Sequence, residues 1–196
     1  MRDRGAHPVG SLRGAHTFRS AHRDLRAGRE RTLLARDLVG RQLPTLTLLS
    51  YMEKRVELPH AGAGGLVIYA YPAADSSPDG AGESMAADAA QHRAFGAALV
   101  DFEACSLLAV GLSSESPQVQ RDRVLEHRIG HPLWSDPELL VAGALGLPTF
   151  THAAVGCYRR LMLVARGGRI VKAFFPVEDA HRSAAQVIFW ARATGG

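Results

Sequence analysis

Polar side chains on either side of a glycine- and serine-rich stretch near the middle of the chain could form a reactive pocket. Tyr69 and Tyr71 precede this stretch, whereas Glu83, Ser84 and His92 follow it. Phenol, carboxylate, hydroxyl and imidazole groups that converge in a pocket can take protons from a substrate and return them. These residue types therefore indicate acid–base chemistry on a small molecule.

The spacing argues against a serine-hydrolase arrangement. Ser84 and His92 are eight residues apart in one predicted helix. They are therefore separated by about 12 Å along its axis, which is too far for a hydrogen bond. The sequence GAGES around Ser84 also differs from the GxSxG nucleophile elbow. His92, a lone histidine on an apolar helix face, is equally compatible with a structural role.

The cysteine and histidine spacing gives no support for a metal site or a disulfide framework. Cys105 and Cys157 are the two cysteines, and neither a CxxC nor an HExxH motif occurs. No cofactor is expected. Cys105 precedes a buried strand and is interpreted as an inert apolar side chain, whereas Cys157, expected nearer the surface, is the better candidate for a reactive thiol. A disulfide between them requires Cα atoms within about 7 Å, which the sequence leaves open.

Charge is distributed unevenly along the 196 residues. Residues 1–36 contain nine Arg and three acidic residues, whereas the other 160 contain 14 basic and 16 acidic ones. We therefore predict an Arg-rich disordered extension over 1–36 and one folded domain over 37–196. The domain has no basic surplus, so a nucleic-acid partner is not expected. No apolar run is long enough to span a membrane, and no secretory signal is recognised at the start, so we expect a cytoplasmic location.

Strands and helices alternate in the hydrophobic pattern of the predicted domain. Continuous apolar runs at 66–71 and 106–113 are typical of strands buried on both faces. Apolar residues at three- and four-residue intervals predict a helix over 84–103. The other predicted elements are strands at 46–49 and 54–59, helices at 117–127, 137–146 (capped by Asp136) and 179–192, and a hairpin of 158–166 with 169–177. This order predicts an α/β thioredoxin-like fold, a central mixed sheet with helices on both faces.

Two features, one in the predicted hairpin and one just before it, bear on a pocket. Arg159 and Arg160 are adjacent on a strand, so one side chain faces solvent and the other faces inward. The inward arginine could line the pocket or pair with Asp136 or Glu138. Residues 148–158, with His152 near the tip, are interpreted as a lid over the pocket or as a simple connector.

From about residue 38 to 193 the chain resembles the peroxiredoxins, the alkyl hydroperoxide reductase/thiol-specific antioxidant family. The resemblance is carried by LVGRQLPTLTL, VIYAYP, VGLSSESP, PLWSDPELLVAGALGLPTF and YRRLMLVARGGRIVKAFFPV, in that order. In this family a reactive cysteine follows the Tyr-Pro dipeptide, here Tyr71-Pro72, at the start of a helix. Helix N-terminus and a nearby arginine favour its thiolate, which attacks a peroxide.

The resemblance implies roles for several residues of this chain. Ser84 falls at the position of the peroxidatic cysteine and Ala89 at a position used for a resolving cysteine. Arg160 matches the active-site arginine, whereas Met162 replaces a common threonine. A serine hydroxyl cannot form a sulfenic acid, so ordinary peroxidase turnover at Ser84 is not expected.

Three functions are compatible with this combination. The first is non-redox chemistry on a small oxygenated substrate, with Ser84, Glu83 and Arg160 as the catalytic residues. Tyr69, Tyr71, Pro72, His92 and His152 would then line the substrate pocket. The second is a thiol-dependent peroxidase that uses Cys157 or Cys105, or a Cys-to-Ser variant of one. The third is a non-catalytic binding or dimerisation module; the resemblance implies a homodimer in each case.

Overall fold

The computed structural model describes residues 35–62, 64–74 and 84–195. Within these residues the main sheet has seven strands in the order β2-β1-β5-β4-β3-β8-β9. Strands β3, β4 and β5 are parallel, whereas β1, β8 and β9 pair antiparallel with their neighbours. The strands are β1 (Thr47–Ser50), β2 (Arg55–Glu57), β3 (Leu66–Ala70), β4 (Leu108–Ser113), β5 (Leu133–Ser135), β8 (Leu161–Arg166) and β9 (Arg169–Phe174). The predicted central mixed sheet is confirmed.

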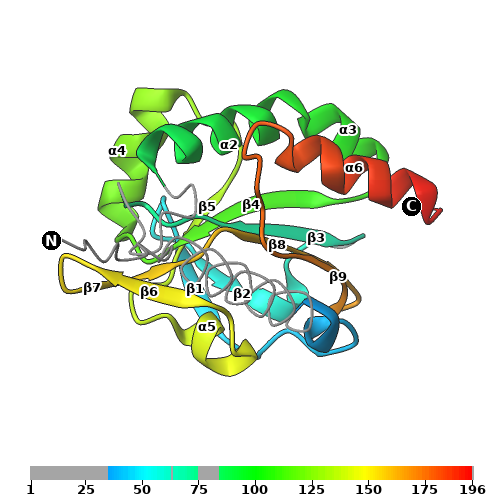
Figure 1. Cartoon of the computed structure of the whole chain (residues 1–196), viewed down its shortest axis with the longest axis horizontal. Helices are drawn as coiled ribbons and strands as arrows, with labels where there is room; N and C mark the ends of the chain where they lie inside the picture. Colours follow the sequence, from blue (N-terminus) through cyan, green and yellow to red (C-terminus); the bar gives the residue numbers. More distant parts are fainter. Residues whose placement is uncertain (1–34, 63, 75–83, 196) are drawn as a thin grey trace, which may run out of the picture.

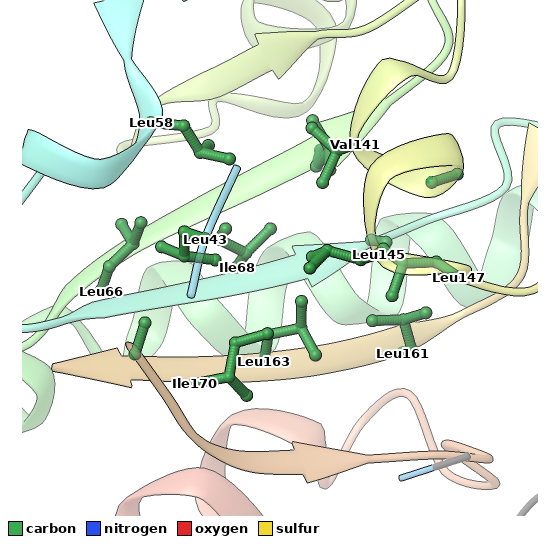
Figure 2. Close-up of a cluster of buried hydrophobic side chains, with 14 of the residues drawn as sticks. Leu43, Leu58, Leu66, Ile68, Val141, Leu145, Leu147, Leu161, Leu163 and Ile170 are labelled. Atoms are coloured by element: carbon green, nitrogen blue, oxygen red, sulfur yellow. The ribbon is translucent and has the colours of Figure 1, made fainter. Parts of the chain in front are cut away.

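Strand β3 lies in the middle of the sheet and has both faces buried. Its side chains alternate, so Leu66, Ile68 and Ala70 enter one hydrophobic cluster. Val67 and Tyr69 enter the cluster on the opposite face. Figure 2 shows the first cluster, in which leucines of β3 and β8 meet residues of helix α5 (Leu140–Leu145). A continuous apolar run was therefore the correct signal for a strand covered on both sides.

Helices cover both faces of the sheet, as the sequence predicts. Helices α2 (Met85–Ala97), α3 (Leu99–Ala104), α4 (Pro117–His127) and α6 (Ser183–Ala193) lie on one side, and α5 lies on the other (Figure 1). The single helix predicted over 84–103 is divided at Ala98, whose N–H donates to Phe95 O. The break follows Gly96 and two alanines, a run of small residues where a helix axis can change direction. Phe102 still stacks on Phe95, with ring centroids 5.2 Å apart.

Capping side chains fix where several helices begin. Ser116 accepts a hydrogen bond from Val119 N–H at the start of α4, as expected for a serine before Pro117. Asp136 caps α5, accepting from the N–H groups of Leu140 and Val141. Helix α5 nevertheless begins at Leu140 and not at Pro137, because residues 137–139 first form a turn around that carboxylate.

Two hairpins complete the domain. Gly167 and Gly168 join β8 to β9 with φ values of 55° and 73°, which confirms the predicted tight turn. Residues 148–158 are not a loop: β6 (Thr149–His152) and β7 (Val155–Tyr158) form a separate two-stranded sheet. Ala153 and Ala154 make its turn with positive φ values. Because alanine rarely adopts this conformation, the sequence carried no turn signal here.

Two further expectations concern the extension at the start of the chain and the absence of a membrane span. Apart from its last two residues, the extension predicted over 1–36 lies outside the described residues. Among the residues that are described, no helix is both long enough and apolar enough to cross a membrane.

Candidate functional site

Arg160 lies at the centre of a buried polar cluster between the sheet and α2. The residue immediately precedes β8, and its side chain has the same orientation as Met162 and Val164, towards α2. Its Nη2 atom lies 2.7 Å from Asp88 Oδ1, and its Nη1 atom donates to Gln91 Oε1 at 2.6 Å. Only 4% of Arg160 is exposed, and Asp88 and Gln91 are completely buried. Of the two adjacent arginines, Arg160 is thus the inward one, and its partner is neither Asp136 nor Glu138.

The Asp88 carboxylate is held on both of its oxygens. Oδ1 accepts from Arg160, and Oδ2 accepts from the backbone N–H of Ala73 at 3.0 Å. Ala73 has a φ of 56°, a left-handed conformation that is uncommon for alanine. Burial raises the pKa of Asp88 to about 6, although the charge and hydrogen bond of Arg160 act in the opposite direction. This carboxyl group would therefore change its protonation close to neutral pH.

Gln91 contributes a polar atom that has no partner among the described residues. Its Oε1 accepts from Arg160, while its Nε2 is buried without a hydrogen bond to any of them. A buried donor left unpaired typically costs about 1–3 kcal/mol. Such groups are rare and call for a specific explanation. Here an unused N–H₂ group lies beside a guanidinium and a carboxylate.

Ser84 begins the helix that carries these residues. Its Oγ accepts a hydrogen bond from Ala87 N–H at 3.1 Å, and its backbone oxygen accepts from Asp88 N–H. It is half-buried and serves as the N-cap of α2, one helical turn before Asp88. Among the described residues, the anionic side chain that contacts Arg160 is that of Asp88.

A second polar group lies one turn further along α2. The hydroxyl of Tyr69 is 2.8 Å from His92 Nδ1 and 2.5 Å from His131 Nε2. All three side chains are buried. Burial lowers the pKa of His92 to about 2 and that of His131 to about 4, so both rings are neutral at pH 7. Burial also raises the pKa of Tyr69 well above its usual value, which keeps the phenol protonated.

Tyr71 connects the same region to a buried ion pair. Its ring meets that of His92 edge-on, with centroids 4.6 Å apart, and its hydroxyl donates to Glu115 Oε2 at 3.1 Å. Glu115 also binds the guanidinium of Arg123 through a short contact. Burial disfavours the charged form of Arg123, but the hydrogen bond and charge of Glu115 outweigh it and raise the pKa of Arg123.

Comparisons with solved structures identify the fold. No protein-family model matches the chain, and no curated protein matches it in sequence. Peroxidoxin BcpB from Mycobacterium tuberculosis superposes with a TM-score of 0.67 at 17% identity, over 81% of this chain and 98% of that one. PrxQ from Xylella fastidiosa gives a TM-score of 0.67 at 21% identity, over 81% and 97%. Peroxiredoxin 6 of Arenicola marina superposes with a TM-score of 0.65 at 12% identity, over 80% of this chain and 72% of that one.

The chain has a peroxiredoxin-type, thioredoxin-like fold. The resemblance described in the sequence is thereby confirmed at the level of architecture. Within this peroxiredoxin-type fold the Tyr71-Pro72 dipeptide follows β3, and α2 follows the intervening segment, as the resemblance implies. Arg160 lies on the α2 side of the sheet, and Met162 is buried in the same layer.

The peroxiredoxin-type fold brings together only some of the residues singled out in the sequence. Tyr69, Tyr71 and His92 lie in one connected group, and Pro72 is buried directly after Tyr71. His152 lies at the end of β6 and is half-buried. Glu83 falls outside the described residues, so its role stays a prediction.

Both cysteines are buried and neither forms a disulfide. Cys157 was expected nearer the surface, but only 4% of it is exposed, because β7 packs it against Phe150 and Ala74. Its Sγ lies 3.6 Å from Val155 O. Cys105 is buried at the end of α3, in agreement with an inert side chain.

Sequence reasoning overlooked Asp88, Gln91 and His131. A usable signal was present for the first two, since residues 88, 91, 92 and 95 recur at three- and four-residue intervals. Polar residues on the stripe that faces the core are unusual, and they mark buried networks. His131 carried no such signal, because it lies between elements and reaches Tyr69 only through the fold.

Proposed function

We propose that this domain performs non-redox chemistry on a small oxygenated substrate, with the Asp88 carboxylate in the place beside Arg160 that a peroxidatic thiolate would take. The resemblance implies an anion next to this arginine. In this chain the anion 2.7 Å from the guanidinium is a carboxylate, and carboxylate oxygen cannot pass through a sulfenic acid. The Asp88–Arg160 ion pair is the observation that carries the proposal.

The surroundings of Asp88 favour proton transfer. A carboxyl group with a pKa of about 6 can serve as a general base or acid near neutral pH. The unpaired Nε2 of Gln91 and the guanidinium of Arg160 are donors to which a substrate oxygen would bind. Asp88 would then take a proton from the substrate while these donors stabilise the developing negative charge on oxygen.

The proposal leaves Ser84 as a helix cap, whereas the resemblance places Ser84 at the peroxidatic position. The variants Asp88→Cys and Ser84→Cys separate these assignments. We expect the thiol of Asp88→Cys to have a depressed pKa beside Arg160 and to form a sulfenic acid rapidly with hydrogen peroxide. Ser84→Cys, a half-buried thiol at the N-cap of α2, should form sulfenic acid more slowly, because Arg160 contacts residue 88. The reverse order of rates would return the anion position to residue 84.

The thiol-dependent alternative is tested on the wild-type protein. Cys157 is the better candidate because its neighbour Ala74 follows Ala73, whose N–H binds Asp88. Hydrogen peroxide is added, and oxidation of each cysteine is followed by mass spectrometry. We expect both thiols to react slowly. Rapid, selective oxidation of Cys157 together with peroxide consumption would overturn the non-redox proposal.

Binding is tested separately from reaction. Acetate and acetamide serve as small oxygen-bearing probes, and the side-chain amide signals of Gln91 are followed by NMR. A saturable shift of these signals, absent in an Arg160→Met variant, supports a site at Asp88 and Arg160. No response to either probe would favour the non-catalytic module instead.

A further inference from the structure

The second polar group has the connectivity of a proton pathway. The Tyr69 hydroxyl contacts one ring nitrogen of His92 and one of His131, and a neutral phenol can donate only one of these two hydrogen bonds. The other is therefore donated by a histidine N–H. The two hydrogen bonds thus point in the same direction, from one imidazole through the phenol to the other.

The outer nitrogen of each ring is unpaired. Within the part of the chain that the structure describes, His92 Nε2 and His131 Nδ1 are both buried without a hydrogen-bond partner. Two orphan ring nitrogens flanking one hydroxyl would together cost about 2–6 kcal/mol if they served packing alone. Buried polar groups of this kind are retained where they have a chemical role.

Space for the central hydroxyl is built into the sheet. Gly111 on β4 is paired with Tyr69 on β3. A Cβ atom at residue 111 would lie 2.8 Å from the Tyr69 hydroxyl oxygen, closer than real contacts allow. The absence of a side chain at this position therefore permits the phenol to lie between the two imidazoles.

The two ends of the group lie near different surroundings. His131 lines a groove of about 530 Å³ together with Gly130, Pro132, Phe102 and Glu103. His92 follows Asp88 by one turn on the same face of α2, roughly 6 Å along the axis. The group thus lies between a surface groove and the layer that contains the Asp88 carboxylate.

We propose that His131, Tyr69 and His92 form a proton relay between this groove and the Asp88 site; the inference rests on the proposed acid–base function. A base buried from solvent needs a route by which its proton is returned. In one direction a proton enters at His131 Nδ1, the Nε2 proton of His131 passes to the Tyr69 oxygen, the phenol proton passes to His92 Nδ1, and the Nε2 proton of His92 leaves towards the site. One proton enters and one leaves, and all three groups end neutral.

The protons must move together. A stepwise transfer would leave an imidazolium ion among buried side chains, where desolvation strongly disfavours charge. The geometry also imposes a rule on the resting states. If Tyr69 donates to His92, both rings carry hydrogen on Nε2; if Tyr69 donates to His131, both carry hydrogen on Nδ1. The two histidines must therefore always be the same tautomer, and they must exchange together.

The relay is tested on the full chain labelled with ¹⁵N-histidine. Long-range ¹H–¹⁵N spectra report which ring nitrogen carries hydrogen. We expect His92 and His131 to be neutral, to show the same tautomer balance, and to change that balance in parallel as temperature changes. Opposite tautomers, a charged ring, or tautomers that stay fixed at every temperature would overturn the relay. Because wild-type protein gives this result, the test does not depend on a variant that folds.

Two variants sharpen the assignment. Tyr69→Phe keeps the ring stacked on Phe95 but removes the hydroxyl, so the two histidines should lose their parallel behaviour. Tyr158→Phe is the matched control, because it removes a buried hydroxyl that binds Asp136 instead; both rings should then behave as in wild type. Parallel behaviour that survives Tyr69→Phe would contradict the relay. The tautomers are read without any activity, so this result is independent of the peroxide tests on Asp88→Cys.

Discussion

Arg160 and Asp88 are 72 residues apart in the sequence, yet Nη2 of the arginine lies 2.7 Å from Oδ1 of the aspartate in the interior. The contact joins the start of β8 to the first turn of α2. Because neither side chain is appreciably exposed, the pair is only weakly screened by solvent. Its energetics and its chemistry can therefore be tested by removing one partner at a time.

The first prediction concerns stability. Asp88→Asn removes the carboxylate that contacts the buried guanidinium of Arg160, and we expect a loss of about 3–5 kcal/mol in the free energy of unfolding. Arg160→Met should cost a similar amount at pH 8, where the carboxylate would be buried alone. The double variant should lose less than the sum of the two changes, as judged by urea unfolding at pH 8. Strict additivity would show that the two groups do not interact.

The second prediction concerns the pH dependence of stability. The pKa of Asp88 is raised to about 6, so its contribution is present below the unfolded value of 3.8 and is lost as pH rises to about 6. The lowered pKa values of His92 and His131 act in the opposite sense: their contributions are present above 6.5 and are lost as pH falls. Between pH 4 and 6 the unfolded state therefore binds about one more proton than the folded state at these three groups, and stability should rise with pH.

The variant Asp88→Asn separates the histidine contributions to this pH dependence from that of the carboxyl group. Without the opposing carboxyl group, the histidine contributions stand alone between pH 4 and 6. The slope of the free energy of unfolding against pH should then increase from about 1.4 to about 2.7 kcal/mol per pH unit. Urea unfolding at half-unit intervals measures both slopes. An unchanged or shallower slope in the variant would contradict a raised pKa at Asp88.

The third prediction concerns the close approach of β4 to Tyr69. Gly111→Ala would place a Cβ 2.6 Å from Leu133 Cδ2 and 2.8 Å from the Tyr69 hydroxyl, so we expect a loss of about 1–3 kcal/mol. Gly143→Ala in α5 is the matched control, because a Cβ there meets nothing within 4 Å. It should be neutral or stabilise by up to about 1 kcal/mol. Thermal unfolding of the two variants provides the comparison.

The fourth prediction concerns Ser84. Ser84→Ala removes the hydrogen bond from Ala87 N–H to the cap and should cost about 1 kcal/mol. Ser84→Asp keeps an acceptor oxygen at the cap and should retain most of that stability. The carboxyl pKa of Asp88, followed by ¹³C NMR, should remain near 6 in the alanine variant. A large change would place Ser84 in direct contact with the buried cluster.

Much of the fold was predictable because its strands are continuous apolar runs separated by strong turn and cap signals. Gly167 and Gly168 fixed the hairpin turn, and Ser116 before Pro117 fixed the start of a helix, through local chemistry. The predictions failed where the local signal was absent. The turn at Ala153 and Ala154 has no glycine or asparagine, and the division of the long helix at Ala98 is marked only by a run of small residues.

The candidate site was harder to predict because its members meet only in three dimensions. The alternation of a strand correctly indicated one inward arginine, but it could not identify the partner on α2. Sequence reasoning concentrated on Ser84 as a nucleophile position, whereas the buried charge one turn later is Asp88. His131 belongs to no predicted motif, and only the packing of the segment before β5 brings it to Tyr69.

The alternation of β3 also has a consequence for how the chain reaches its native alignment. The strand presents Tyr69 to one layer and Ile68 and Ala70 to the other. A slip by one residue would bury a phenol among leucines and deprive two imidazoles of their shared contact. Strands with only apolar side chains can pair with their neighbours in many registers of similar free energy. In this domain the Tyr69 hydroxyl in the central strand favours the one register that places it between the two imidazoles.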